Sequence, residues 1–349
     1  MAYNNKVRLP EDEEDPRFTQ SFSIDQEAEI KEFFAQYGVV VVRDVLSEEE
    51  CQASVQEMIE FIEANSQFRY QDPSTWHHWP NGGIESFGQC QREPYFFRTF
   101  MNNRQNENVH RVFALIYNIP KEQLLVNFDR GCLFRPTKDI TYPDGNVRTN
   151  MKLQTRANVH LDLNPWEFLK EGSTKAFEEL SKLRYGNKLS NFIYENNQVH
   201  QSMYDGPHLQ AGINLIENEI SDGGFVCVPG FANHFERWAA DNSKSAFVDA
   251  ANEKNSVAFP DNHILQDRAQ RVSMRAGSMV IWDQRTPHGS FGNRSSRFRS
   301  AQFLKVFPNN ILEMQPNRKK ARANTLRRII RDIPGFELTP LGRHVFGLS

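Results

Sequence analysis

Thr286-Pro-His288-Gly-Ser-Phe-Gly-Asn-Arg-Ser-Ser-Arg-Phe-Arg299, taken with the shorter motif His160-Leu-Asp162, is the stretch that decides the fold. Residues i and i+2 of a strand project from one face, so His160 and Asp162 can reach the same ion. His288 would add a second imidazole from a distant strand. Two imidazoles and a carboxylate form a facial triad, which leaves three positions of an octahedral Fe(II) open. The two motifs therefore predict an iron site on neighbouring strands.

A cation follows the second motif on what reads as another strand. The segment Arg297-Phe-Arg-Ser-Ala-Gln-Phe-Leu-Lys-Val-Phe307 alternates in a way typical of a strand with one buried face. A guanidinium there can bind a carboxylate through two hydrogen bonds, as a dicarboxylic acid held by iron at its other end requires. Arg299 is preferred because it lies on the opposite face from Phe298. Arg294 and Arg297 are close enough in sequence to remain alternatives.

Longer segments around these motifs resemble the phytanoyl-CoA dioxygenase-type (PhyH-like) family of Fe(II)/2-oxoglutarate oxygenases. Three segments are similar to parts of the family: an opening helix, strand and helix at Glu32–Cys51, a Gly-rich strand at Asp222–Gly230, and the strand and turn at Ala276–Ser290. One loop departs from the pattern. The family usually has Pro-Gly-Ser-His after the Gly-rich strand, whereas this chain has Pro229-Gly-Phe-Ala-Asn-His234.

The resemblance implies a mainly β fold with flanking α-helices around a double-stranded β-helix core of the jelly-roll or cupin type. It implies iron held by His160, Asp162 and His288, and the co-substrate 2-oxoglutarate held by Arg299. The expected reaction uses O2 to hydroxylate, or otherwise oxidise, an unactivated C–H bond of a small organic substrate, with succinate and CO2 as co-products. Halogenases of this superfamily have Gly or Ala in place of Asp162, so hydroxylation is expected here. Desaturation, ring closure and epimerisation use the same triad and stay open.

Length and composition indicate one domain. The chain has 349 residues, of which 39% are hydrophobic and 12% aromatic, enough for a large buried core. No repeat, low-complexity block or Gly/Ser linker divides it. We therefore expect a single dioxygenase domain over 1–349, with an N-terminal arm at 1–22, an insertion at 163–205 that forms a lid or substrate wall, and a C-terminal helical extension at 317–349.

Local patterns predict most of the scaffold. Ser23 is expected to cap a helix that ends at Gly38, and Ser47 to open a second helix, with a buried strand at Val39–Val42 between them. Further helices are expected at 107–118 and 166–184, and strands at 124–134, 158–163, 209–216, 224–228, 278–282 and 299–307.

Charge and targeting signals indicate neither a nucleic-acid nor a membrane partner. The net charge of −3 provides no general attraction to nucleic acid or acidic membranes. We predict an intracellular, cytoplasmic protein without membrane contact, because the chain has four scattered cysteines without a Cys-x-x-Cys motif, no signal peptide and no bilayer-spanning run.

The basic segment 318–331 resembles a nucleic-acid patch, but Leu326, Ile329 and Ile330 form an apolar stripe, so a packed helix with a solvated basic face is favoured. Nothing indicates an oligomeric state.

The segment 68–100 is dense in aromatic and arginine side chains. Its ordinary interpretation is core and loop packing; the functional one is an aromatic substrate pocket, with His77, Trp79, Arg92 or Arg98 as contacts. Together with the insertion, this segment favours a bulky or apolar substrate.

Two other functions are compatible with the same barrel. One is a cupin-type metal enzyme that does not use 2-oxoglutarate, and the other is a non-catalytic barrel that serves as a binding module. The cupin-type enzymes normally lack an arginine placed like Arg299, and a binding module would be expected to have lost a ligand, yet none of His160, Asp162 and His288 is missing.

Overall fold

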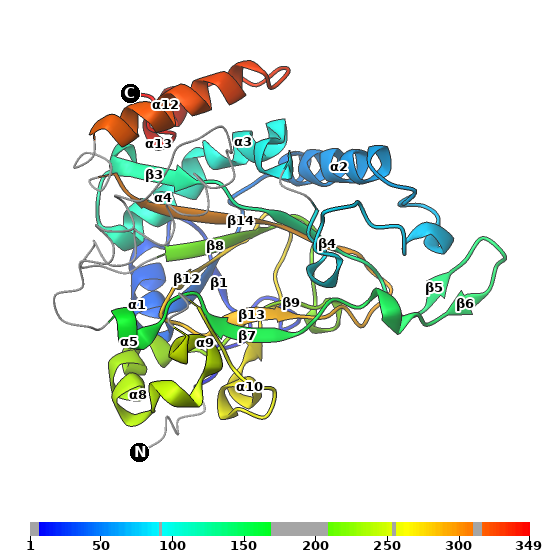
Figure 1. The fold of residues 1–349 in the computed structure, drawn as a ribbon, viewed down its shortest axis with the longest axis horizontal. Helices are drawn as coiled ribbons and strands as arrows, with labels where there is room; N and C mark the ends of the chain where they lie inside the picture. The colour runs from blue at the N-terminus through cyan, green and yellow to red at the C-terminus, as the bar shows by residue number, and fades with distance from the viewer. Residues whose placement is uncertain (1–6, 91–92, 169–208, 253–255, 310–315) are drawn as a thin grey trace.

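The computed structural model describes residues 7–90, 93–168, 209–252, 256–309 and 316–349 (Figure 1). Two sheets dominate these ranges. The larger has seven strands in the order β1-β2-β12-β8-β14-β3, with β4 also paired to β14. Its strands are β1 (Ser21–Phe22), β2 (Val39–Val42), β3 (Leu124–Asn127), β4 (Gly131–Phe134), β8 (Leu209–Asn214), β12 (Met279–Asp283) and β14 (Arg299–Pro308).

The smaller sheet has five strands in the order β10-β7-β13-β9-β11. They are β7 (Asn158–Leu161), β9 (Gly224–Cys227), β10 (Val257–Ala258), β11 (Gln270–Arg271) and β13 (His288–Phe291). Except for the parallel pair β1 and β2, all neighbours in both sheets are antiparallel. A separate hairpin of β5 (Ile140–Thr141) and β6 (Val147–Arg148) projects from one end of the molecule (Figure 1).

Helices cover the outer sides of the two sheets. Those of the described ranges are α1 (Glu27–Tyr37), α2 (Glu48–Ala64), α3 (Arg98–Arg104), α4 (Glu107–Tyr117), α5 (Pro165–Phe168), α8 (Phe235–Asp241), α9 (Val248–Ala251), α10 (Ile264–Arg268), α12 (Pro316–Arg331) and α13 (Pro340–Val345). Short 3-10 turns connect them at Pro73–Thr75, Glu85–Phe87, Glu93–Phe96, Lys121–Gln123, Met151–Leu153, Ile220–Asp222, Phe231–His234 and Lys244–Ala246. In Figure 1, α2, α3, α12 and α13 lie beside the larger sheet, and α8 and α10 lie beside the smaller one.

Strand β14 shows how the two faces of the larger sheet are used. Gln302 points outward, where it accepts a hydrogen bond from Asn103 of α3 at 2.8 Å and donates to the carbonyl of Phe100 at 3.1 Å. Lys305 points inward, and its ammonium lies 3.6 Å from Asp162 beside the smaller sheet. Because side chains alternate along a strand, the odd-numbered residues of β14 face the space between the sheets.

Most predicted elements form, with shifted boundaries. Ser47 caps α2 through a reciprocal capping box with Glu50, as predicted. Helix α1 starts at Glu27 and not just after Ser23, because the side chain of Gln26 accepts a hydrogen bond from the Ser23 backbone at 2.9 Å and closes a turn there. The strand predicted at 124–134 is interrupted by residues 128–130 and forms β3 and β4.

Two further segments bear on the predicted organisation. Strand β1 is the end of the predicted N-terminal arm, and it extends the larger sheet. Of the predicted insertion at 163–205, and of the helix predicted at 166–184, only the residues up to 168 are described; 169–205 lie outside the described ranges. Across those ranges, no helix combines the length and apolarity that a bilayer crossing needs.

Candidate metal centre

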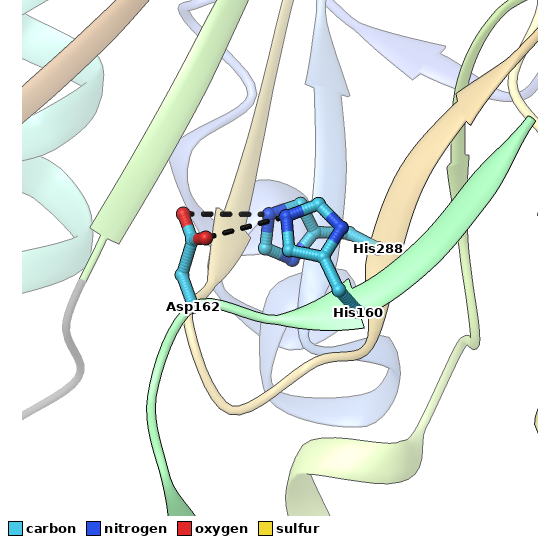
Figure 2. Close-up of side chains that lie close together, drawn as sticks. All are labelled: His160, Asp162 and His288. Carbon is cyan, nitrogen blue, oxygen red and sulfur yellow. Dashed lines mark ion pairs between the residues drawn. The ribbon is translucent and has the colours of Figure 1, made fainter. Parts of the chain in front are cut away.

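His160, Asp162 and His288 come together where β7 and β13 pair. The two histidines lie directly opposite each other in the antiparallel register, and their rings are 4.8 Å apart. Asp162 follows the end of β7, with Oδ1 3.2 Å from Nε2 of His160 and Oδ2 3.8 Å from Nε2 of His288. Figure 2 shows the carboxylate facing both rings. One ligand atom from each residue lies within 4.8 Å of the others, so the three side chains can contact one ion.

Neighbouring groups fix both imidazoles. Nδ1 of His288 lies 3.0 Å from the carbonyl oxygen of Thr286, which can only accept, so Nδ1 carries the proton and Nε2 faces Asp162 with its lone pair. Asn158, on the same face of β7 as His160, has its amide nitrogen 3.2 Å from Nδ1 of that ring. The amide oxygen of Asn158 accepts a hydrogen bond from the Ser290 backbone at 3.0 Å, which ties β7 to β13 beside the site.

The charges around the site suit cation binding. Burial alone would raise the pKa of Asp162, but the positive charge of Lys305 and the hydrogen bond from His160 hold that pKa well below its usual value. Burial, helped by the neighbouring His160, lowers the pKa of His288 to about 4. At neutral pH Asp162 is therefore ionised and His288 is neutral, which are the protonation states that metal ligands need. A metal ion would replace the proton through which Nε2 of His160 donates to Asp162.

Arg299 reaches from the larger sheet towards β9 of the smaller one. It is 3% exposed, and its guanidinium lies 5.1 Å above the ring of Phe134. Nη1 donates to Sγ of Cys132 at 3.4 Å, whereas the buried Nε has no hydrogen-bond partner among the described residues. A Cβ on Gly224 would lie 2.7 Å from that Nε, so β9 approaches the guanidinium closely at this glycine.

The pairing of β9 with β13 gives the approximate separation between Arg299 and the triad. Cys227 of β9 pairs with His288, and Gly224 is three residues earlier on the same strand, a separation of roughly 10 Å at the usual rise of a strand. The buried guanidinium of Arg299 therefore lies beside the β9–β13 pair at Gly224, about three residues along β9 from the position opposite His288.

The two alternative arginines are engaged elsewhere. Arg297 forms an ion pair with the buried Asp222 and lies 3.4 Å from Glu219. Arg294 is exposed, and its guanidinium lies 4.9 Å from the ring of Phe291. Of the three candidates, Arg299 alone presents a buried guanidinium between the two sheets.

Part of the aromatic-rich segment packs around Phe298, which is what its ordinary interpretation predicts. Tyr70 stacks on Phe298 at 4.3 Å, and Trp76 contacts the same ring edge-on at 4.8 Å. Phe298 precedes Arg299 on the chain and so lies on the other side of the backbone. His77 is exposed, with its ring 3.8 Å from that of His78. Of the other proposed contacts, Arg92 lies outside the described residues.

A groove of about 950 Å³ lies apart from this centre, between α2, residues 96–99 and the end of α12. Glu57, Arg98 and Ile329 are among its lining residues, and no member of the triad is. The loop that departs from the family pattern packs on the end of α1, where the Asn233 side chain donates to the carbonyls of Ala35 and Gln36 at 3.0 and 3.1 Å.

Sequence reasoning missed the polar side chains of the larger sheet that face Asp162. Gln210 of β8 donates to Oδ2 of Asp162 at 2.7 Å, and Lys305 of β14 lies 3.6 Å from the same oxygen. The sequence did contain a signal for Lys305, which is a charged residue in an otherwise apolar run. Because side chains alternate along a strand, Lys305 lies on the same face as Arg299.

Known proteins resemble this chain in sequence and fold. The family model described as phytanoyl-CoA dioxygenase (PhyH) matches residues 195–301, which include His288 and Arg299. A Dictyostelium discoideum protein that bears this family's name is 37% identical over 326 residues, covering 91% of this chain and 86% of its own length. Ectoine dioxygenase from Stutzerimonas stutzeri is 30% identical over 100 residues, which is 27% of this chain and 33% of that protein.

The solved structure of a hypothetical protein from Escherichia coli has the same fold, with a TM-score of 0.56 at 12% identity, over 94% of this chain and 85% of its own. The relationship to the Dictyostelium protein extends over nearly the whole length of both chains. The chain belongs to the phytanoyl-CoA dioxygenase family, and it is a non-haem iron oxygenase that uses Fe(II), 2-oxoglutarate and O2.

Proposed function

We propose that this enzyme oxidises an unactivated C–H bond of a small organic substrate, with hydroxylation as the outcome, and that His160, Asp162 and His288 hold the iron while Arg299 binds the far carboxylate of 2-oxoglutarate. The single observation that carries the proposal is the convergence of the three ligand atoms within 4.8 Å of one another. The name of the ectoine dioxygenase relative supports a small substrate.

The triad fits an Fe(II) ion, and Arg299 fits a carboxylate of 2-oxoglutarate. Two imidazole nitrogens and a carboxylate oxygen are the donor set of non-haem Fe(II) oxygenases. The unpartnered Nε of Arg299 is a buried donor without an acceptor, which is costly unless a ligand supplies one. A carboxylate satisfies both the charge and the unused donor.

When bound, iron and 2-oxoglutarate supply oxidation of a C–H bond by O2, with release of succinate and CO2. The chain's own contribution is placement, since the C–H bond held nearest the metal decides the product. The carboxylate of Asp162 occupies the position that would have to be vacant for a halide, and this supports hydroxylation.

The proposal includes the core and the domain organisation. The antiparallel strands β12, β8, β14 and β3 of one sheet and β7, β13 and β9 of the other are what a double-stranded β-helix would supply. The triad on the smaller sheet and Arg299 on the larger one lie on the inner sides of the two layers, which supports one catalytic domain formed by both sheets.

The decisive experiment is an anaerobic titration of metal-free protein with Fe(II) and then 2-oxoglutarate, followed by the visible charge-transfer absorption of the chelate. We expect a band in the wild type and none in His160→Ala, whereas His77→Ala, which removes an exposed histidine, should behave as wild type. Wild-type protein that binds iron without a band on addition of 2-oxoglutarate would favour the cupin-type alternative. Wild-type protein that binds no iron would favour the binding module.

Arg299→Ala tests the co-substrate site in the same assay. We expect its affinity for 2-oxoglutarate to fall on the order of 10- to 100-fold, because a hydrogen bond to a charged group contributes about 1.5–3 kcal/mol. Arg294→Ala removes a nearby exposed arginine and should leave that affinity unchanged. Equal affinity in Arg299→Ala and wild type would show that the carboxylate is bound elsewhere.

A further inference from the structure

Three adjacent strands of the larger sheet present a row of side chains to Asp162. In the register of the sheet, Trp282 of β12 lies opposite Gln210 of β8, and Gln210 lies opposite Lys305 of β14. Residues that are paired across strands project from the same face of a sheet. The row therefore forms one level of the inner wall, directly across from the carboxylate.

Gln210 is the centre of this row, and both the oxygen and the nitrogen of its side-chain amide form hydrogen bonds. The side chain is 2% exposed. Its oxygen accepts a hydrogen bond from Nε1 of Trp282 at 3.0 Å, and its nitrogen donates to Oδ2 of Asp162 at 2.7 Å. An indole N–H can only donate and an ionised carboxylate can only accept, so the amide of Gln210 has one possible orientation.

Lys305 adds a charge on the same side of the carboxylate. Its ammonium lies 3.6 Å from Oδ2 of Asp162 and 3.7 Å from Oδ2 of Asp129. The other oxygen of Asp129 accepts a hydrogen bond from the Arg130 backbone at 2.8 Å, which holds that second carboxylate in place. Oδ1 lies 3.2 Å from Nε2 of His160, and Oδ2 lies 3.8 Å from Nε2 of His288. The two oxygens differ because Oδ2 also has the ammonium of Lys305 and the amide of Gln210 as neighbours, and a metal cation approaching Oδ2 would meet that ammonium.

We propose that Gln210, oriented by Trp282, is a positioning residue that holds Asp162 so that only Oδ1 is presented to the metal. The proposal rests on the proposed function, because it concerns the same triad. A carboxylate that bound through both oxygens would occupy two positions of a six-coordinate ion. Only two positions would then remain, too few for a chelating 2-oxoglutarate together with O2. The hydrogen bond to Oδ2 thus keeps the third position available.

Gln210→Leu tests this role, since it removes the donor while keeping an apolar side chain of similar size. We expect roughly 10-fold or greater weakening of Fe(II) affinity, as is typical when a partner of a metal ligand is lost, and a shifted charge-transfer band with 2-oxoglutarate. Trp282→Phe keeps the amide of Gln210 but frees it to rotate, so its effect on both quantities should lie between those of wild type and Gln210→Leu.

Gln302→Leu is the matched control, because Gln302 is an equally buried glutamine on the outer face of β14. It should lower thermal stability without changing Fe(II) affinity or the band. Two results would overturn the proposal: a wild-type affinity and band in folded Gln210→Leu and Trp282→Phe, or the same loss in Gln302→Leu. A missing band in the wild type would instead contradict the proposed function, so the two failures are distinguishable.

Discussion

Buried histidines couple the stability of this protein to pH. His110 of α4 is 0% exposed, and its Nε2 lies 2.6 Å from the carbonyl of Arg104. Burial lowers its pKa to about 4, as it does for His288. An unfolded histidine titrates near pH 6.5. As the pH falls below that value, the histidine binds a proton in the unfolded chain but stays neutral in the native chain. Stability is therefore lost between pH 6.5 and pH 4.

His110→Gln isolates this effect away from the metal centre. Metal-free wild-type protein should lose up to about 3 kcal/mol of unfolding free energy through His110 alone as the pH falls from 6.5 to 4. The variant should lack that contribution and show a shallower dependence on pH, whatever its absolute stability. Urea unfolding at several pH values measures both slopes. Parallel curves for the two proteins would mean that His110 titrates normally in the native state.

At the level of elements, the close approach of β9 to Arg299 of β14 shapes the proposed co-substrate site. Gly224 has a φ of +108°, which favours glycine, and an added Cβ would meet Nε of Arg299 at 2.7 Å. The strand can therefore pass beside the guanidinium only because a side chain is absent here. Gly212 of β8 has space instead, since a Cβ there would meet its nearest neighbour, the ring of Phe303, at 3.7 Å.

Gly224→Ala should displace Arg299 and weaken 2-oxoglutarate binding by roughly 10-fold, equivalent to about 1.4 kcal/mol. It should also destabilise the fold, since a Cβ is strained at that φ. Titration of the Fe(II)-loaded variant with 2-oxoglutarate measures the first effect. Gly212→Ala is the control and should bind 2-oxoglutarate like wild type. An unchanged affinity in Gly224→Ala would mean that Arg299 can move without loss.

For the molecule as a whole, the C-terminal helices close the end of the larger sheet. Leu326 of α12 is 0% exposed, as is Phe346, whose ring stacks 5.9 Å from that of Phe128. The buried Arg322 donates to the Val126 carbonyl of β3 at 2.6 Å. The apolar stripe predicted for 318–331 is therefore a packing face. Exposed arginines such as Arg327 lie on its other side.

Leu326→Ala should reduce the free energy of unfolding by about 2–5 kcal/mol, because it opens a cavity between α12 and the core. Arg327→Ala removes an exposed side chain from the same helix turn and should change it by less than about 0.5 kcal/mol. Denaturant unfolding of the two variants compares them directly. A small effect of Leu326→Ala would show that α12 does not contribute to the cooperative core.

Local chemistry explains what could be predicted. The capping box of Ser47 and Glu50, the apolar strand β2 and the His-x-Asp spacing each depend on residues a few positions apart, so the sequence displays them directly. The start of α1 was wrong by a few residues because the turn at Ser23 competes with the helix for the same backbone groups. The break between β3 and β4 carries no strong local signal.

The sequence by itself determined the family, the three candidate ligands and a set of three candidate arginines, because these follow from residue type and spacing. Among these the sequence favoured Arg299, but only the tertiary structure shows that Arg299 is buried while Arg294 is exposed and Arg297 is paired with Asp222. Only the tertiary structure brings Gln210 and Lys305 to Asp162. The physical reason is that such contacts depend on which strands become neighbours and in what register. That choice is made by the packing of the two sheets, over separations that no local pattern encodes.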